Sequence, residues 1–187
     1  MKTFVEFLIE LSLGKAGVFA DNAHKGQHRK TSGAPYIIHP TAVVRILQKL
    51  GVKDKNILVA AYLHDVLENS SISYNDIKRE FNKEISQLVK EVTSNKKGIT
   101  VYGKPKYLAH KMIKSSDAGL IIKLADRAHN ISDLSSMKQD KAQAYADQTF
   151  FIIAELKEKR QLNKYHKKLI KILNKSLTKY KKQVHTL

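Results

Sequence analysis

The chain has 187 residues, of which 42% are hydrophobic and 27% are charged, and its formal net charge is +17. This length and composition fit one globular domain, residues 1–187, and exclude a disordered chain and a membrane-embedded one. The sequence has no cysteine, which excludes disulfides, thiolate metal ligands and a cysteine nucleophile and favours a cytoplasmic location.

Apolar residues recur at the spacing of a helix along most of the chain, and the alternation typical of strands is sparse, which predicts an all-α fold. The first apolar segment is shorter than a membrane span and carries acidic residues. We therefore expect an amphipathic helix with no membrane partner, and its apolar face is predicted to be Val5, Leu8, Ile9 and Leu13. The predicted helices are 3–23, 40–50, 55–68, 74–93, 105–116, 118–134, 140–159 and 161–182.

Turn-forming residues separate the predicted helices. They gather at 31–35, 69–71 and 95–105, where we expect loops. Ser73, followed three positions later by Asp76, is an acidic variant of a capping arrangement and predicts that a helix begins at residue 74.

Three short segments place polar residues beside strongly apolar ones. Their polar groups are predicted to be semi-buried and to need partners, because burying them unpaired costs several kcal/mol. The segments are Arg29-Lys30-x-x-Gly33-x-Pro35-Tyr36-x-x-His39-Pro40, His64-Asp65-x-x-Glu68-Asn69 and Lys123-Leu124-Ala125-Asp126-Arg127-Ala128-His129-Asn130.

A metal ion is a partner that these residue types favour, since imidazoles with carboxylates suit manganese, iron or zinc. His64 and Asp65 lie about 100° apart on a helix, close enough to reach one ion. Glu68 follows His64 by one helical turn, which suits a general base beside a metal. Each motif alone is a weak signal, because single matches are common, but the three in order predict one site.

The chain resembles the HD-superfamily hydrolase domain of SpoT/Rel-type alarmone enzymes, and most closely the stand-alone small alarmone hydrolases. The three motifs carry the resemblance, which runs from about Ala23 to Leu134. It implies a compact bundle of about ten helices without a significant sheet. It also implies an enzyme that hydrolyses the 3′-pyrophosphate of (p)ppGpp to GDP or GTP plus pyrophosphate, with Mn²⁺ or another divalent metal.

The resemblance also implies roles for single residues. His39, His64, Asp65 and Asp126 match the metal ligands of the family. Glu68 matches the first of two acidic residues that activate water, and Asn69 stands at the second. The predicted substrate contacts are the matching residues Arg29, Lys30 and Asn130, together with Lys104, Lys106 and Tyr107 from the region of the 95–105 loop.

Asn69 is a departure from the family, which has an acid there. An amide can orient a water molecule but cannot accept its proton at neutral pH. Because the four ligand positions and the basic pair are intact, we expect a working enzyme in which Glu68 is the base and Asn69 positions the water.

The sequence leaves two other functions open. One is an HD phosphohydrolase that acts on another nucleotide or phosphorylated metabolite. The other is a weakly active or non-catalytic binder, suggested by Asn69 and by the basic C-terminal helices, residues 140–182. Eleven Lys or Arg residues lie between Lys157 and Lys182. They favour a solvated helix face over a nucleic-acid surface, because no recognition motif accompanies them.

Overall fold

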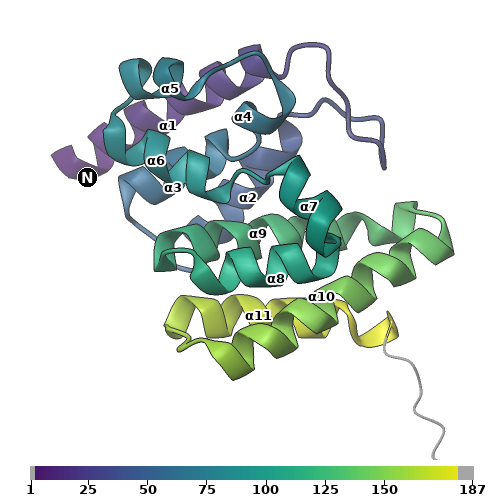
Figure 1. Cartoon of the computed structure of the whole chain (residues 1–187). Coiled ribbons are helices and arrows are strands. Elements are labelled where there is room, and N and C mark those ends of the chain that lie inside the picture. The colour runs from purple at the N-terminus through teal and green to yellow at the C-terminus, as the bar shows by residue number, and fades with distance from the viewer. Residues whose placement is uncertain (1–2, 181–187) are drawn as a thin grey trace, which may run out of the picture.

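The computed structural model describes residues 3–180, and these form helices joined by short loops (Figure 1). Within this range the backbone has no strand beyond a single bridge between His28 and Pro35, so the predicted all-α class is confirmed. The α-helices are α1 (Phe4–Ala23), α2 (Ile38–Lys49), α3 (Lys55–Leu63), α4 (Val66–Asn69), α5 (Tyr74–Glu80), α6 (Lys83–Val92), α7 (Lys96–Tyr102), α8 (Lys104–Lys114), α9 (Asp117–Ser132), α10 (Gln139–Lys159) and α11 (Lys164–Ser176). Two 3₁₀ helices are η1 (Asp133–Ser136) and η2 (Thr178–Tyr180).

Helix α9 is the centre of the bundle. It packs against α2, α3 and α6 on one side and against α8, α10 and α11 on the other (Figure 1). Its apolar run Leu120–Ile122 is buried, and Ser116 caps its N-terminus by accepting a hydrogen bond from Gly119 N. Because α9 is enclosed, any polar residue in its middle faces the interior.

Two of the predicted helices are each broken in two. The segment 55–68 divides at His64–Asp65 into α3 and α4, and the segment 74–93 divides at Phe81–Asn82 into α5 and α6. The capping box of Ser73 and Asp76 begins α5 as predicted. Asn82 begins α6, because its side chain accepts a hydrogen bond from Ile85 N at 2.8 Å.

The predicted loop 95–105 is wrong in part, because it contains α7. Asn95 caps this helix by accepting a hydrogen bond from Lys97 N at 2.9 Å.

The four residues of the predicted apolar face of α1 divide between the core and the surface. Ile9 packs against the core and Leu13 is buried, whereas Val5 and Leu8 are exposed.

The C-terminal helices cover α9 from below in Figure 1. Helix α11 buries Leu169, Ile170 and Leu173, and its lysines lie on the opposite, exposed face. Residues 181 and 182 of the predicted helix 161–182 lie outside the described residues. Among the helices of residues 3–180, none has the length and hydropathy needed to cross a bilayer.

Arg160 joins three helix ends. Its Nη1 donates to the carbonyl oxygens of Met112, Ile113 and Ser115 at the end of α8, and its Nη2 lies 2.8 Å from Asp117 Oδ1 at the start of α9. The last carbonyls of a helix lack partners within the helix, so this guanidinium supplies donors that α8 cannot.

Replacing this guanidinium should therefore destabilise the fold. We expect Arg160→Met to lower the free energy of unfolding by roughly 2 kcal/mol, because hydrogen bonds to a charged group are lost from a largely buried site. Urea denaturation followed by circular dichroism measures the loss. The matched control is Arg79→Met, since Arg79 is exposed and forms an ion pair with Asp76 on its own helix. Equal losses in the two variants would contradict the role of Arg160.

Candidate metal centre

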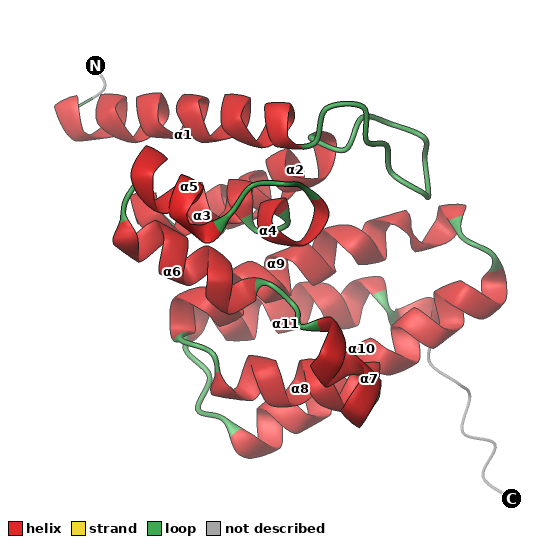
Figure 2. Ribbon diagram, turned by 45° about the horizontal axis from the view of Figure 1, so that its top comes forward, coloured by secondary structure: helices red, strands yellow, loops and turns green. Residues whose placement is uncertain are grey.

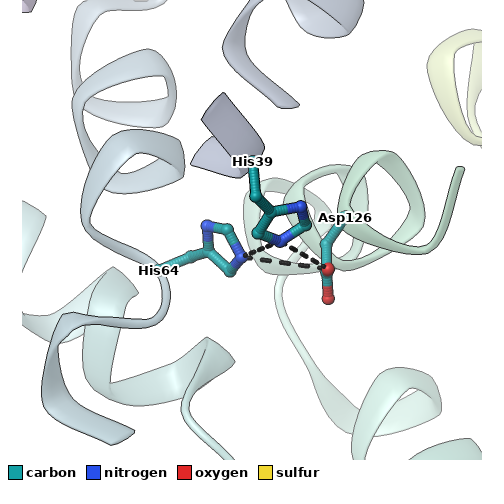
Figure 3. Close-up of side chains that lie close together, drawn as sticks. All are labelled: His39, His64 and Asp126. Atoms are coloured by element: carbon teal, nitrogen blue, oxygen red, sulfur yellow. Dashed lines mark hydrogen bonds and ion pairs between the residues drawn. The ribbon is translucent and has the colours of Figure 1, made fainter. Parts of the chain in front are cut away.

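Three helical segments bring His39, His64 and Asp126 to one point (Figure 3). His39 lies in the first turn of α2, His64 directly follows α3, and Asp126 lies in the middle of α9. All three residues are at most 9% exposed. One nitrogen or carboxylate oxygen from each lies within 4.8 Å of the others.

The fourth predicted ligand, Asp65, lies beside these three. Nε2 of His39 is 3.2 Å from Nε2 of His64 and 3.3 Å from Oδ1 of Asp126. Oδ2 of Asp65 is 3.2 Å from Nε2 of His64 and 3.6 Å from Nε2 of His39. The structure therefore brings all four residues together, with the His64–Asp65 pair on a turn between helices and not on a continuous helix.

These donors fit a divalent metal ion. Atoms that lie about 2.1 Å from one ion are separated from each other by roughly 3 to 4 Å. The distances among His39, His64 and Asp126, and from Asp65 to the two histidines, are 3.2 to 3.8 Å. Nδ1 of His64 lies 2.8 Å from the carbonyl oxygen of Ala61. Because a carbonyl only accepts, Nδ1 carries a proton, and Nε2 is the nitrogen through which His64 would bind an ion.

The charge on Asp126 is supported by its neighbours. Lys123 Nζ donates to Oδ2 of Asp126 at 2.9 Å, and Asn130 Nδ2 donates to Oδ1 at 2.6 Å. Burial raises the pKa of a carboxyl group, but Lys123 and the two imidazoles outweigh this effect and hold the pKa of Asp126 well below its usual range. Asp126 is therefore an anion, as a metal ligand must be.

Tyr36 orients Asp65, a role that the sequence did not reveal. Its hydroxyl donates to Oδ2 of Asp65 at 2.6 Å. Burial and the negative charge of Asp65 raise the pKa of the Tyr36 phenol, so it stays protonated and remains a donor. In the same way His129 contacts His39, with the two Nδ1 atoms 2.8 Å apart. Tyr36, Lys123 and His129 all belong to the sequence motifs. Lys123 and His129 lie three residues before and after Asp126, and this spacing was the signal that could have placed them near it.

A two-part cleft lies beside the four residues. The inner hollow, of about 240 Å³, includes Asp65, Asp126 and Lys123 in its walls. The outer hollow, of about 490 Å³, is lined by Gln27, His28, Arg29, Lys30, Thr31 and Met137. Both are lined by Tyr36, Asn69 and Asn130, so these three residues mark the boundary between the hollows.

The other predicted site residues divide between this cleft and other places. Glu68, Asn69 and Lys104 line the inner hollow, and Arg29 and Lys30 line the outer one. Oε2 of Glu68 accepts a hydrogen bond from Ser94 N at 3.1 Å, which fixes the carboxylate against the loop before α7.

Lys106 and Tyr107 do not line either hollow. Lys106 lines a separate groove between α8 and α10 with His110 and Glu155. The Tyr107 hydroxyl accepts a hydrogen bond from Asn95 N at 2.7 Å, and its ring lies against Gly98. Tyr107 therefore holds α7 against α8.

Arg29 is connected to the metal centre through Asn130. Nη2 of Arg29 donates to Oδ1 of Asn130 and to Oδ2 of Asp133, both at 2.8 Å. Asn130 in turn contacts Asp126. Asp133, which the sequence did not single out, thus neutralises Arg29 and fixes the plane of its guanidinium at the outer hollow.

Comparison with known families identifies the class of this fold and site. The model of the HD domain matches residues 16–161, and the chain therefore belongs to the HD domain family.

Curated relatives narrow the resemblance to the SpoT/Rel group. The chain is 38% identical over 150 residues to the bifunctional (p)ppGpp synthase/hydrolase SpoT of Escherichia coli K12. The aligned region covers 77% of this chain and 21% of that protein. The chain is 35% identical to a guanosine-3′,5′-bis(diphosphate) 3′-pyrophosphohydrolase of Aquifex aeolicus, with 76% of this chain and 20% of that protein covered. The chain thus spans about a fifth of the length of these relatives.

Solved structures share the fold. One, described as a metazoan ortholog of SpoT that hydrolyses ppGpp, superimposes with a TM-score of 0.75 at 27% identity, over 88% of this chain and 94% of that one. A Listeria monocytogenes structure has a TM-score of 0.58 at 22% identity, over 75% of this chain and 99% of that one, and shares the fold alone.

Metal binding can be tested without a substrate. We expect Mn²⁺ to raise the melting temperature of the wild-type chain, because a ligand at about 100 times its Kd stabilises a protein by roughly 2.7 kcal/mol. His64→Ala and Asp126→Asn should lose this rise. The control His110→Ala, an exposed histidine of α8, should keep it. A rise of equal size in all four proteins would contradict the assignment.

The role of Tyr36 can be tested in the same way. We expect Tyr36→Phe to weaken Mn²⁺ binding on the order of 10-fold, because residues that orient metal ligands typically contribute that much. Titration calorimetry measures the affinity. Tyr165→Phe is the control, since it also removes a hydroxyl hydrogen bond, to the carbonyl oxygen of Gly51, away from the centre. An unchanged affinity in Tyr36→Phe would refute the role.

Proposed function

We propose that this chain hydrolyses the 3′-pyrophosphate of (p)ppGpp to GDP or GTP plus pyrophosphate, with Mn²⁺ as its metal. The observation that carries the proposal is the proximity of His39, His64, Asp65 and Asp126 beside a cleft whose outer part carries basic side chains. The SpoT relatives, and a structural neighbour whose length is covered almost completely, support this substrate.

The outer hollow suits a nucleoside. Its volume of about 490 Å³ lies within the usual size of small-molecule sites, about 300 to 1,000 Å³. Nη2 of Arg29 is already bonded to Asn130 and Asp133, and one flat face of the guanidinium lies over the Tyr36 ring, 5.7 Å from its centre. The opposite face is the part best suited to a ligand, because such a face stacks on a purine. The exposed Lys30 beside it can pair with a phosphate.

The inner hollow suits the reacting phosphate. A divalent metal held by the four residues would lower the pKa of a water molecule and polarise a phosphoryl oxygen. Glu68 takes or steers the proton of the attacking water, and the Asn69 amide orients that water. Lys104, in the same wall, offsets the charge of the phosphates.

We propose that residues 1–187 form one HD-type domain that acts in the cytoplasm on a small molecule. The lysine face of α11 is exposed, and we assign it to solvent. A nucleic-acid partner is not part of this proposal.

The proposal predicts how Glu68 and Asn69 behave. We expect Mn²⁺-dependent release of pyrophosphate from ppGpp by the wild-type chain, and a loss on the order of 100- to 10,000-fold in kcat for Glu68→Gln, since it removes a general base. We expect Asn69→Asp to change the rate far less. His64→Ala is the inactive control.

Three results would contradict parts of this function. An inert wild type whose activity is restored by Asn69→Asp would show that the second acid is the base. Faster turnover of GTP, a deoxynucleotide or NADPH than of ppGpp would assign the site to another substrate. Tight ppGpp binding by calorimetry without hydrolysis in Mn²⁺ would make the chain a binding protein.

A further inference from the structure

The N-terminal helix α1 is apolar on two opposite faces. One face packs against α3 and buries Leu13, Ala16 and Ala20. At about 100° per residue, the residues of a second stripe fall within an arc of roughly 100° on the other side of the helix. This outer stripe consists of Phe4, Phe7, Leu8, Leu11 and Val18, which are 41% to 74% exposed.

The outer stripe is large enough for an interface. A phenylalanine side chain covers about 150 to 250 Å², and at the observed exposures the five residues leave roughly 500 Å² of apolar surface. The largest apolar patch on a typical soluble protein is about 300 to 600 Å², and such a patch is often functional. A standard interface buries about 800 Å² on each partner, which the stripe and its polar rim together can supply.

Charge distinguishes between the possible occupants. The chain has a net charge of +17, but α1 carries Glu6, Glu10 and Asp21 against only Lys15. An anionic lipid surface or a nucleic acid would therefore be attracted elsewhere and repelled here. A second copy that meets this helix with its own α1 keeps the basic remainder of both chains away from the contact.

The shape of α1 is complementary to itself. Its N-terminal half carries the bulky Phe4, Phe7 and Leu8. In its C-terminal half, nothing lies within 4 Å of the position that a Gly14 side chain would take, and a hollow of about 870 Å³ adjoins Leu11, Gly14 and Val18. Bulk at one end and a hollow at the other is the pattern that a two-fold axis brings together.

We propose that two copies of this chain form a dimer through antiparallel pairing of their outer stripes. In that arrangement Leu11 faces Leu11 of the second copy across the two-fold axis. Phe4 faces Val18 of the second copy, and Leu8 enters the hollow at its Gly14. The contact uses the same surface on both copies, so it closes and does not propagate into a fibre. Helix α1 lies along the outer edge of the bundle, so a second copy can approach it (Figure 2).

Sedimentation equilibrium of the full chain tests the dimer. We expect twice the mass of the chain for the wild type and the mass of one chain for Leu11→Glu, which buries a charge at the axis. Leu11→Glu should keep its helical circular dichroism and its Mn²⁺-dependent rise in melting temperature, because Leu11 is outside the core. The matched control is Val101→Glu on α7, because Val101 is an apolar residue that is 71% exposed, against 62% for Leu11, and its substitution should leave the dimer intact.

The natural absence of cysteine allows a geometric test. We expect Leu11→Cys to form a disulfide-linked dimer under mild oxidation at protein concentrations where Val101→Cys stays monomeric. The two-fold axis requires this result, because only a residue near the axis meets its own counterpart.

Three outcomes would overturn the proposal. They are a monomeric wild type at all concentrations, a dimer that Leu11→Glu does not disrupt, and a Leu11→Cys chain that crosslinks no faster than Val101→Cys. Flotation with vesicles of neutral and of anionic lipid tests whether a membrane surface covers the outer stripe instead. Binding that Leu11→Glu abolishes, together with a monomeric wild type, would assign the stripe to a membrane surface.

Discussion

The buried carboxylate of Asp126 constrains the rest of this structure. A charge taken out of water costs several kcal/mol unless attraction and hydrogen bonds offset the loss. Here Lys123 and Asn130 come from the same helix, and His39 and His64 come from two others. Helix α9 must be apolar enough to occupy the centre and polar enough to support this charge. Its neighbours α2 and α3 must end or begin where their histidines reach it.

The helical character and the four clustered residues were accessible from the sequence, because periodicity and motif order report them directly. The break at His64–Asp65 was not accessible. Nothing in the local sequence stops a helix at His64–Asp65, and the turn there follows from packing. The caps Asn82 and Asn95 were readable, since an asparagine before a helical run is a start signal. Periodicity also joined Val5 and Leu8 to Ile9 and Leu13 in one apolar face of α1, whereas only Ile9 and Leu13 meet the core.

The structure brings the predicted residues of the three motifs to one cleft, but it separates those taken from the assumed loop. Lys104 and Lys106 are about 200° apart once residues 104–114 are helical. Lys104 therefore lines the inner hollow and Lys106 lines the groove beside α10. The residues that orient the ligands, Tyr36 and His129, were visible in the motifs. Their partners lie 29 and 90 residues away in the chain, so only the fold reveals the contacts.

The exposed lysines of α11 and the acidic character of α1 have a consequence for the molecule as a whole. These helices lie at opposite ends of the bundle in Figure 1, so acidic side chains at one end are separated from a row of basic side chains at the other. A polyanion that approached this molecule would be attracted from a distance by the net charge of +17. Because salt shortens the range of this field, dissolved ions should slow association more than they speed dissociation.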